Sequence, residues 1–245
     1  MIDYSLHPVL IEVLWILNIQ FSKEACPPYY FMYKNGCIMY IYLNPQYVIR
    51  NENNCSYIIA KSALITAKLE YAMAFASVVP PSIGYILSHI GEGELNASIE
   101  NIANTLNIKP DLIDKFIRKI IDNPVKVGWN YKGVTISFPP YLLTSVKEES
   151  EGSVYTDNEL FYTTDFIPKR PSVPLNLNFM ITTQCRTDCM YCYADRNRKN
   201  DLTSWQIIKV IDEAHDMGGN LALTGGDIFA FPDWKEVIRK VGQYG

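Results

Sequence analysis

Apolar and polar side chains alternate strictly in the segment from residue 175 to residue 182. Every second residue there is leucine, phenylalanine or isoleucine, and asparagine, methionine or threonine stands between them. A period of two is typical of a strand with two unlike faces. This segment is therefore predicted to be a β-strand whose polar face carries Asn176 and Asn178.

The residues after this strand predict a strand–helix repeat. Thr203 and Gln206 have the spacing of a capping box at the start of a helical apolar period, which Gly218-Gly219 ends. A second short strand is predicted over residues 220–224, and Pro232 predicts the start of a second helix. This order of elements indicates an α/β fold.

The region up to residue 144 mixes helical and strand patterns. An Asn-Gly pair between two apolar runs predicts a β-hairpin over residues 29–43. Periodic apolar positions predict two short helices, one from Ser98 and one opened by Pro110, and a second hairpin is predicted over residues 125–138. Helix, turn, helix and hairpin resemble a winged helix, so we predict an α+β, winged-helix-like domain over residues 1–144.

Residues 145–173 differ from the regions on either side. Glutamate and aspartate lie among serine, threonine and glycine there, and prolines close the segment. This composition is typical of a solvated linker. We therefore place the domain boundary inside it, with the α/β domain over residues 174–245.

Composition adds limits to this picture. The chain has 245 residues, of which 48% are hydrophobic and 20% charged, so it has the composition of a soluble globular protein with one large domain or two modest ones. A formal net charge of −4 gives no general attraction to nucleic acid or to an anionic membrane surface. We expect neither as a partner.

Two apolar segments were considered as membrane spans or targeting signals. Residues 1–20 lack a basic leader and a small-residue cleavage site, and we interpret them as a buried helix. Charged residues within 57–90 interrupt the ~20-residue apolar stretch that a bilayer span requires. Six cysteines without a secretory signal fit a reducing compartment, so we predict a cytoplasmic protein.

Three cysteines, Cys185, Cys189 and Cys192, lie together directly after the predicted first strand, where α/β folds expose their chemistry. A structural zinc site takes four ligands, and His215 is the only histidine in this domain. A cubane cluster held by three cysteines instead leaves one iron open for a further ligand. Zinc or structural thiols are the alternatives. Cys26, Cys37 and Cys55 have no metal-like spacing and are interpreted as buried or incidental thiols.

The pattern Cys-x3-Cys-x2-Cys, with Tyr191 just before the last cysteine, resembles the signature loop of radical S-adenosylmethionine enzymes. The resemblance implies that the three cysteines hold a [4Fe-4S] cluster and that Tyr191 packs near the adenine of S-adenosylmethionine. It further implies reductive cleavage of S-adenosylmethionine to a 5′-deoxyadenosyl radical, with an electron donor such as flavodoxin or ferredoxin.

A second segment, Leu223-Thr-Gly-Gly-Asp227, resembles the Gly-Gly-Glu motif of the same family, with aspartate in place of glutamate. Gly225 and Gly226 lack a Cβ, which would let the backbone approach a bound ligand closely. The resemblance therefore places both glycines and Asp227 on the side of the cofactor. An ordinary turn is the alternative interpretation of a Gly-Gly-Asp sequence.

The family resemblance also predicts a fold and its extent. Radical S-adenosylmethionine enzymes have a partial (β/α)6 barrel, in which Asn176 and Asn178 would line the lumen and the apolar face of the strand would pack on helices; a one-sided sheet is the alternative. Only two strand–helix units are present, so we expect an incomplete, truncated barrel that is inactive by itself. The catalytic residues beyond the cluster are not predicted.

Residues 223–232 and the N-terminal extension further resemble maturases of ribosomally synthesised peptides (RiPPs). This implies a precursor peptide as partner, whose leader would add a strand to a hairpin edge of the N-terminal domain. A structural or dimerising domain is one alternative. Others are a non-catalytic iron–sulfur or peptide-binding protein and a winged-helix nucleic-acid-binding protein, although residues 98–122 contain as many acidic as basic residues.

Overall fold

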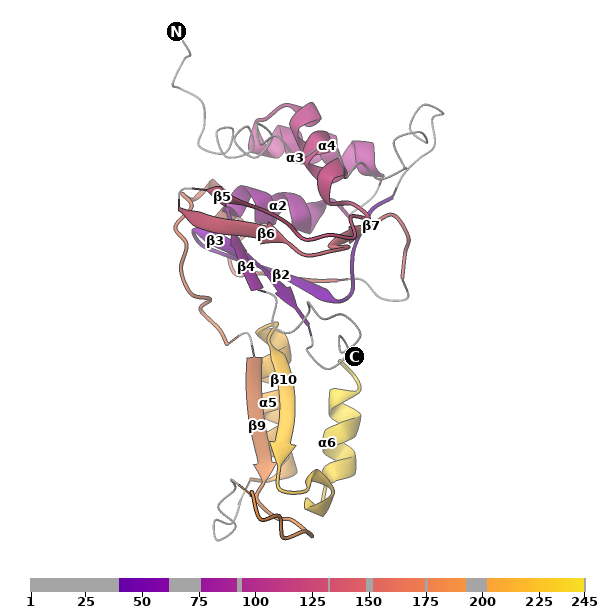
Figure 1. Cartoon of the computed structure of the whole chain (residues 1–245), viewed down its shortest axis with the longest axis vertical. Helices are drawn as coiled ribbons and strands as arrows, with labels where there is room; N and C mark the ends of the chain where they lie inside the picture. The colour runs from indigo at the N-terminus through magenta and orange to yellow at the C-terminus, as the bar shows by residue number, and fades with distance from the viewer. Residues whose placement is uncertain are drawn as a thin grey trace. The chain divides into compact units, whose positions relative to one another are not determined.

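The computed structural model describes residues 40–61, 76–91, 94–131, 133–148, 152–174, 176–192 and 202–244. The chain divides into two compact units, Met1–Pro171 and Ser172–Gly245. Within the described ranges the fold is mixed α/β, with four small sheets and five α-helices (Figure 1). The described strands close no barrel. The predicted N-terminal helix and all but the last four residues of the predicted hairpin over 29–43 lie outside the described residues.

A four-stranded sheet in the order β4-β3-β2-β8 forms the centre of the first unit. β2 (Tyr47–Glu52) pairs antiparallel with β3 (Cys55–Ala60), which pairs antiparallel with β4 (Ala76–Val79). Every residue of β2 and β3 is buried, and α2 (Pro81–His89) packs on both strands. The sequence analysis missed this sheet, because strands buried on both faces do not alternate.

The helix pair and the second hairpin are present as predicted. α3 (Leu95–Leu106) ends at Asn107, which has a left-handed backbone with φ of 53°, and α4 (Pro110–Ile120) begins with proline at its first position. β5 (Val127–Tyr131) and β6 (Val134–Phe138) pair antiparallel. The winged-helix-like description is nevertheless incomplete, because these elements share one unit with the four-stranded sheet.

The aromatic core joins the helix pair to the hairpin. Phe116 of α4 meets Phe138 of β6 edge to face, with 5.5 Å between the ring centroids, and both side chains are fully buried. After the hairpin, β7 (Leu143–Thr144) pairs antiparallel with β1 (Tyr42–Leu43), which precedes the helix pair in the chain. The chain on both sides of the helix pair is thus fixed to the same unit.

The structure differs from the predicted linker over residues 145–173. β8 (Ser153–Thr156) pairs parallel with β2, and the short 3-10 helix η2 (Phe161–Thr163) buries Phe161 against the unit. The hydroxyl of Thr164 accepts a hydrogen bond from the backbone N of Asn54 at 2.9 Å. The acidic residues made this segment resemble a solvated linker, but residues between them, such as Phe161, are buried against the unit.

A buried charge network fastens this segment to the sheet. Arg50 and Glu52 on β2 are only 5% and 2% exposed, and their side chains lie 3.2 Å apart. Arg50 also contacts the Asp157 carboxylate at 3.0 Å, and the Lys169 ammonium lies 3.7 Å from Glu52. Charges taken out of water are costly unless they are paired, so these contacts specify where residues 157–169 lie.

A buried thiol and phenol extend the same attachment. Cys55 Sγ donates to the Tyr57 hydroxyl at 3.0 Å, and that hydroxyl donates to the backbone oxygen of Lys169 at 3.0 Å. Burial is the main cause that raises the pKa of both the Cys55 thiol and the Tyr57 phenol. The interpretation of Cys55 as a buried structural thiol is therefore confirmed, whereas Cys26 and Cys37 lie outside the described residues.

The second unit has the predicted order of strand, helix, strand and helix. β9 (Asn176–Thr182) and β10 (Asn220–Gly225) form a parallel pair, joined by α5 (Ser204–Asp216). The capping box is present: Gln206 N donates to Thr203 Oγ1 at 3.3 Å, and Thr203 N donates to Gln206 Oε1 at 2.9 Å.

The last helix begins slightly later than predicted. α6 (Trp234–Val241) starts two residues after Pro232, because the short 3-10 helix η3 (Ile228–Ala230) and the turn that follows it come first. A buried cluster holds the strands and both long helices together, and the prediction that the apolar face of the first strand packs on helices is confirmed. Its buried members are Ile181, Ile207, Ile211, Phe231 and Val237, with Phe179, Leu221 and Leu223 packed against them.

The opposite face of β9 is polar. Asn176 and Asn178 are exposed, and the Asn220 side-chain amide donates to Asn176 Oδ1 at 3.2 Å. Whether this face lines a lumen stays a prediction. None of the helices within the described ranges combines the length and the apolar character that a bilayer crossing requires.

Replacing Arg50 tests the buried network. We expect Arg50→Met to lower the free energy of unfolding by about 3 to 5 kcal/mol, because Glu52 would stay buried without its nearest cation. The matched control is Arg118→Met, which breaks the half-exposed Arg118–Asp114 pair on α4 and should cost about 0.5 kcal/mol. Urea denaturation followed by circular dichroism measures both. Equal free energies of unfolding for the two variants would show that the buried network stabilises the fold no more than the half-exposed pair does.

Candidate functional site

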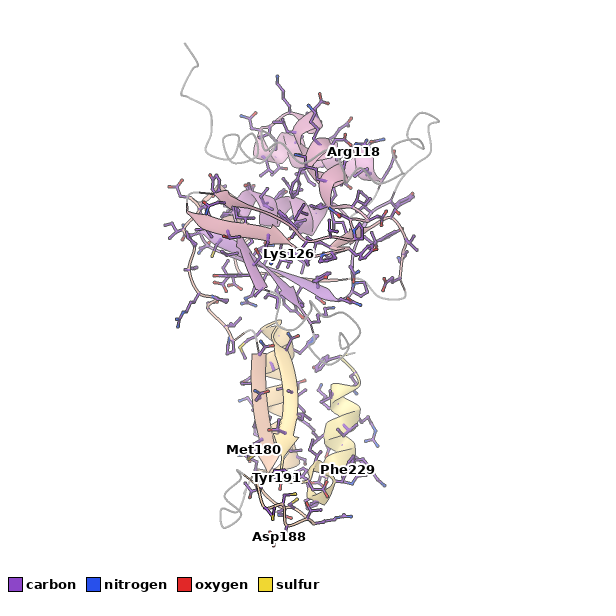
Figure 2. The ribbon with its side chains drawn as sticks, viewed as in Figure 1. Arg118, Lys126, Met180, Asp188, Tyr191 and Phe229 are labelled. Carbon is purple, nitrogen blue, oxygen red and sulfur yellow. The ribbon has the colours of Figure 1, made fainter. Side chains whose placement is uncertain are left out.

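The candidate residues lie on two loops at the same end of the parallel pair. Because β9 and β10 run in the same direction, the loop of residues 183–192 and the loop that begins at Gly226 leave the sheet side by side. Thr182 and Gly225, the last residues of the two strands, are register partners. Figure 2 shows Asp188, Tyr191 and Phe229 at this end of the unit.

All three predicted cysteines lie on the loop after β9. Cys185 and Cys192 are exposed, Cys189 is half-buried, and none of the three is in a disulfide. The Thr187 hydroxyl lies 3.1 Å from Cys185 Sγ and 3.6 Å from Cys189 Sγ. The backbone N of Cys192 donates to the oxygen of Cys189 at 3.1 Å, which forms a turn between the last two cysteines.

The sulfurs do not converge on one point. Among the residues that the structure describes, no three or more histidine, cysteine, aspartate or glutamate side chains are grouped closely enough to hold a metal ion. The donor set nevertheless fits an iron–sulfur cluster in kind and number, because it consists of three thiols on one loop. Two of them are exposed, so their side chains can turn without disturbing the core. Convergence of the three thiolates stays a prediction.

The glycines have a clear structural reason. Gly226 N donates to Thr182 O at 2.9 Å, and Asp227 N donates to Gln184 O at 2.8 Å. A Cβ on Gly226 would stand 2.2 Å from Gln184 O, and one on Gly225 would stand 2.7 Å from Thr182 O. No other residue fits this close approach of two backbones. Gly225 thus packs against the end of β9 and Gly226 against the start of the cysteine loop. Their approach to a bound ligand stays a prediction.

Asp227 links the two loops a second time. Its Oδ1 accepts a hydrogen bond from Phe229 N at 3.0 Å, and its Oδ2 lies 3.9 Å from Arg186 Nε. The Arg186 guanidinium also donates to Phe229 O at 3.4 Å. Sequence reasoning missed Arg186 and Thr187, although their positions between Cys185 and Cys189 gave a signal that these side chains belong to the site.

Tyr191 is available for a ligand. Its side chain is 87% exposed, and the neighbouring Met190 is fully exposed. Phe229, on the loop after β10, is also exposed and meets Trp234 edge to face, with 5.0 Å between the ring centroids. Exposed aromatic and thioether groups therefore lie on the same two loops as the cysteines and the Gly-Gly-Asp sequence. Contact of Tyr191 with an adenine stays a prediction.

No family model, curated protein or solved structure matches this chain.

A Cβ at position 226 tests the contact between the loops. We expect Gly226→Ala to lower the free energy of unfolding of the second unit by about 1 to 3 kcal/mol, because the added methyl group overpacks Gln184. The loosened loop should also be cut faster by trypsin after Arg186. The control is Gly242→Ala, whose Cβ would meet its nearest neighbours at an ordinary 3.5 Å. If both variants behave like the unaltered protein, the close approach at Gly226 is not required.

Proposed function

We propose that this protein is a radical S-adenosylmethionine enzyme whose cluster is held by Cys185, Cys189 and Cys192. One observation carries the proposal. The loop with three cysteines and the loop with Gly-Gly-Asp are far apart in the sequence, but they follow adjacent parallel strands, and backbone hydrogen bonds join Gly226 to Thr182 at the end of β9 and Asp227 to Gln184 in the cysteine loop. A structural turn or incidental thiols would not require this pairing of the two motifs.

The residues of the site have separate roles in this proposal. The three thiols would hold a [4Fe-4S] cluster with one open iron, and Gly225, Gly226, Asp227 and Tyr191 would lie on the side of S-adenosylmethionine. When bound, the cluster and S-adenosylmethionine supply a 5′-deoxyadenosyl radical after one electron arrives from a donor such as flavodoxin or ferredoxin. The protein's own residues would bind and orient S-adenosylmethionine and would exclude water from the site.

Asp227 and Tyr191 are suited to these roles. A carboxylate has about four acceptor sites, and the two hydrogen-bonding groups near Asp227, Phe229 N and Arg186, leave capacity for an ammonium group. Tyr191 offers an exposed aromatic face, on which an adenine ring can stack. Aspartate is one methylene shorter than the glutamate of the related motif, so its reach depends on the position that η3 gives it.

The finer fold follows from the same proposal. β9 and β10 would be the first two strands of a partial (β/α)6 barrel, and the exposed Asn176 and Asn178 would face its interior. Two facts support this: the strands are parallel, and both long helices pack on the other face of the pair.

The proposed substrate is a ribosomally synthesised peptide, and the first unit is its proposed recognition module. β8 stands at one end of the sheet order, and an edge strand is where an extended peptide can add. Its side chains alternate: Ser153 and Tyr155 are half-buried, whereas Val154 and Thr156 are exposed. DNA binding has less support, because Arg118 on the second helix of the pair is ion-paired with Asp114 at 2.7 Å.

Anaerobic reconstitution with iron and sulfide tests the proposal. We expect broad brown absorbance and about four irons and four sulfides per chain. Cys189→Ala should abolish the cluster, because two thiolates cannot hold it. Cys55→Ala is the matched control: this buried thiol donates to Tyr57 in the first unit, so its loss should leave the iron content unchanged.

The opposite result is equally clear. Tight, stoichiometric zinc binding without sulfide would show that the three cysteines form a structural zinc site and not a cluster site. Unchanged iron content in Cys189→Ala would show that the three cysteines are not the ligands.

A further inference from the structure

We propose that Thr187 is a positioning residue that hydrogen-bonds the thiolate ligands of the cluster and raises its reduction potential. The inference depends on the proposed function, because it concerns the same three cysteines. It adds a residue that neither the cysteine pattern nor the Gly-Gly-Asp motif contains.

The geometry places one hydroxyl between two ligands. Thr187 Oγ1 is 3.1 Å from Cys185 Sγ and 3.6 Å from Cys189 Sγ, and both distances are within the range of hydrogen bonds to sulfur. Thr187 lies two residues from each of these cysteines, so the short loop keeps its hydroxyl near both thiols when the cysteine side chains turn to meet at a cluster. The nearer thiol, that of Cys185, is the better partner.

The direction of the hydrogen bond follows from the chemistry of the ligands. A cysteine that binds iron is a thiolate, which has lone pairs but no proton. The Thr187 hydroxyl is therefore the only one of these groups that can donate, and it has a single O–H. It can serve one thiolate at a time, with the other sulfur close by.

Such a hydrogen bond favours the reduced cluster. Reduction adds one negative charge, part of which resides on the sulfurs, so a donor to sulfur stabilises the reduced state more than the oxidised state. Hydrogen bonds to sulfur are one of the factors that set the potential of iron–sulfur clusters. Thr187 would thus make it easier for an electron donor to reduce this cluster.

Arg186 does not replace Thr187 in this role. Its guanidinium is directed to the loop after β10, where it contacts Asp227 and Phe229 O. The two neighbouring residues therefore have different contacts. Arg186 joins the two loops to each other, and Thr187 contacts the thiols.

The test is an EPR-monitored potential titration of the reconstituted full chain and three variants. Thr187→Val is isosteric but lacks the hydroxyl, Thr187→Ala also removes the methyl groups, and Thr187→Ser keeps the hydroxyl. We expect Val and Ala to shift the ratio of reduced to oxidised cluster roughly three- to tenfold toward the oxidised form, which is a fall of about 30 to 60 mV for a one-electron couple. Serine should restore the original potential.

The outcomes separate the two proposals. If the unaltered chain binds no iron–sulfur cluster, the proposed function itself is wrong. If it binds the cluster but valine and alanine leave the potential unchanged, or serine lowers it as much as valine does, the role of Thr187 is overturned. Iron content is measured in parallel, and should Thr187→Val fail to assemble the cluster, the comparison of alanine with serine decides the question.

Discussion

Two backbone hydrogen bonds, from Gly226 N to Thr182 O and from Asp227 N to Gln184 O, hold the loop after β10 against the end of β9 and the start of the loop that follows it. They form only because neither Gly225 nor Gly226 carries a Cβ, which would collide with the carbonyl oxygens of the facing chain. Everything proposed for the site depends on this contact. It places Asp227 and Arg186 within reach of each other, and it fixes the start of the cysteine loop to a strand whose apolar face is buried against two helices.

In the first unit, buried ion pairs instead of backbone hydrogen bonds hold distant segments of the chain together. Arg50 and Glu52 occupy a strand that is buried throughout, and each is paired with a residue from the segment that follows the hairpin, Asp157 or Lys169. Burying these charges separately would be unfavourable, so the pairing selects one path for the chain. That path runs along the edge of the sheet as β8 and reaches Lys169, three residues before the second unit begins at Ser172.

Local patterns in the sequence predicted the second unit well but only part of the first unit, namely the helix pair and the second hairpin and not the four-stranded sheet. The alternation from residue 175 and the Thr203–Gln206 capping box are local signals, and both appear in the structure. β2 could not be predicted, because a buried strand containing Arg50 and Glu52 has neither an alternating nor an apolar pattern. In the site, the cysteines and glycines were predicted from family resemblance. The contact of Gly226 with Gln184 was not, since it depends on the parallel pairing of strands that are distant in the sequence.

If these two loops form one site for a cluster and S-adenosylmethionine, both groups of the cofactor's methionine end should lie at the cluster. Electron–nuclear double resonance tests this on the reduced, reconstituted full chain with S-adenosylmethionine labelled at its amino nitrogen and carboxylate oxygen. We expect hyperfine coupling of both labels to the cluster, because the iron without a cysteine ligand would be open to them. A fully assembled cluster that shows no coupling to either label, at saturating S-adenosylmethionine, would contradict it.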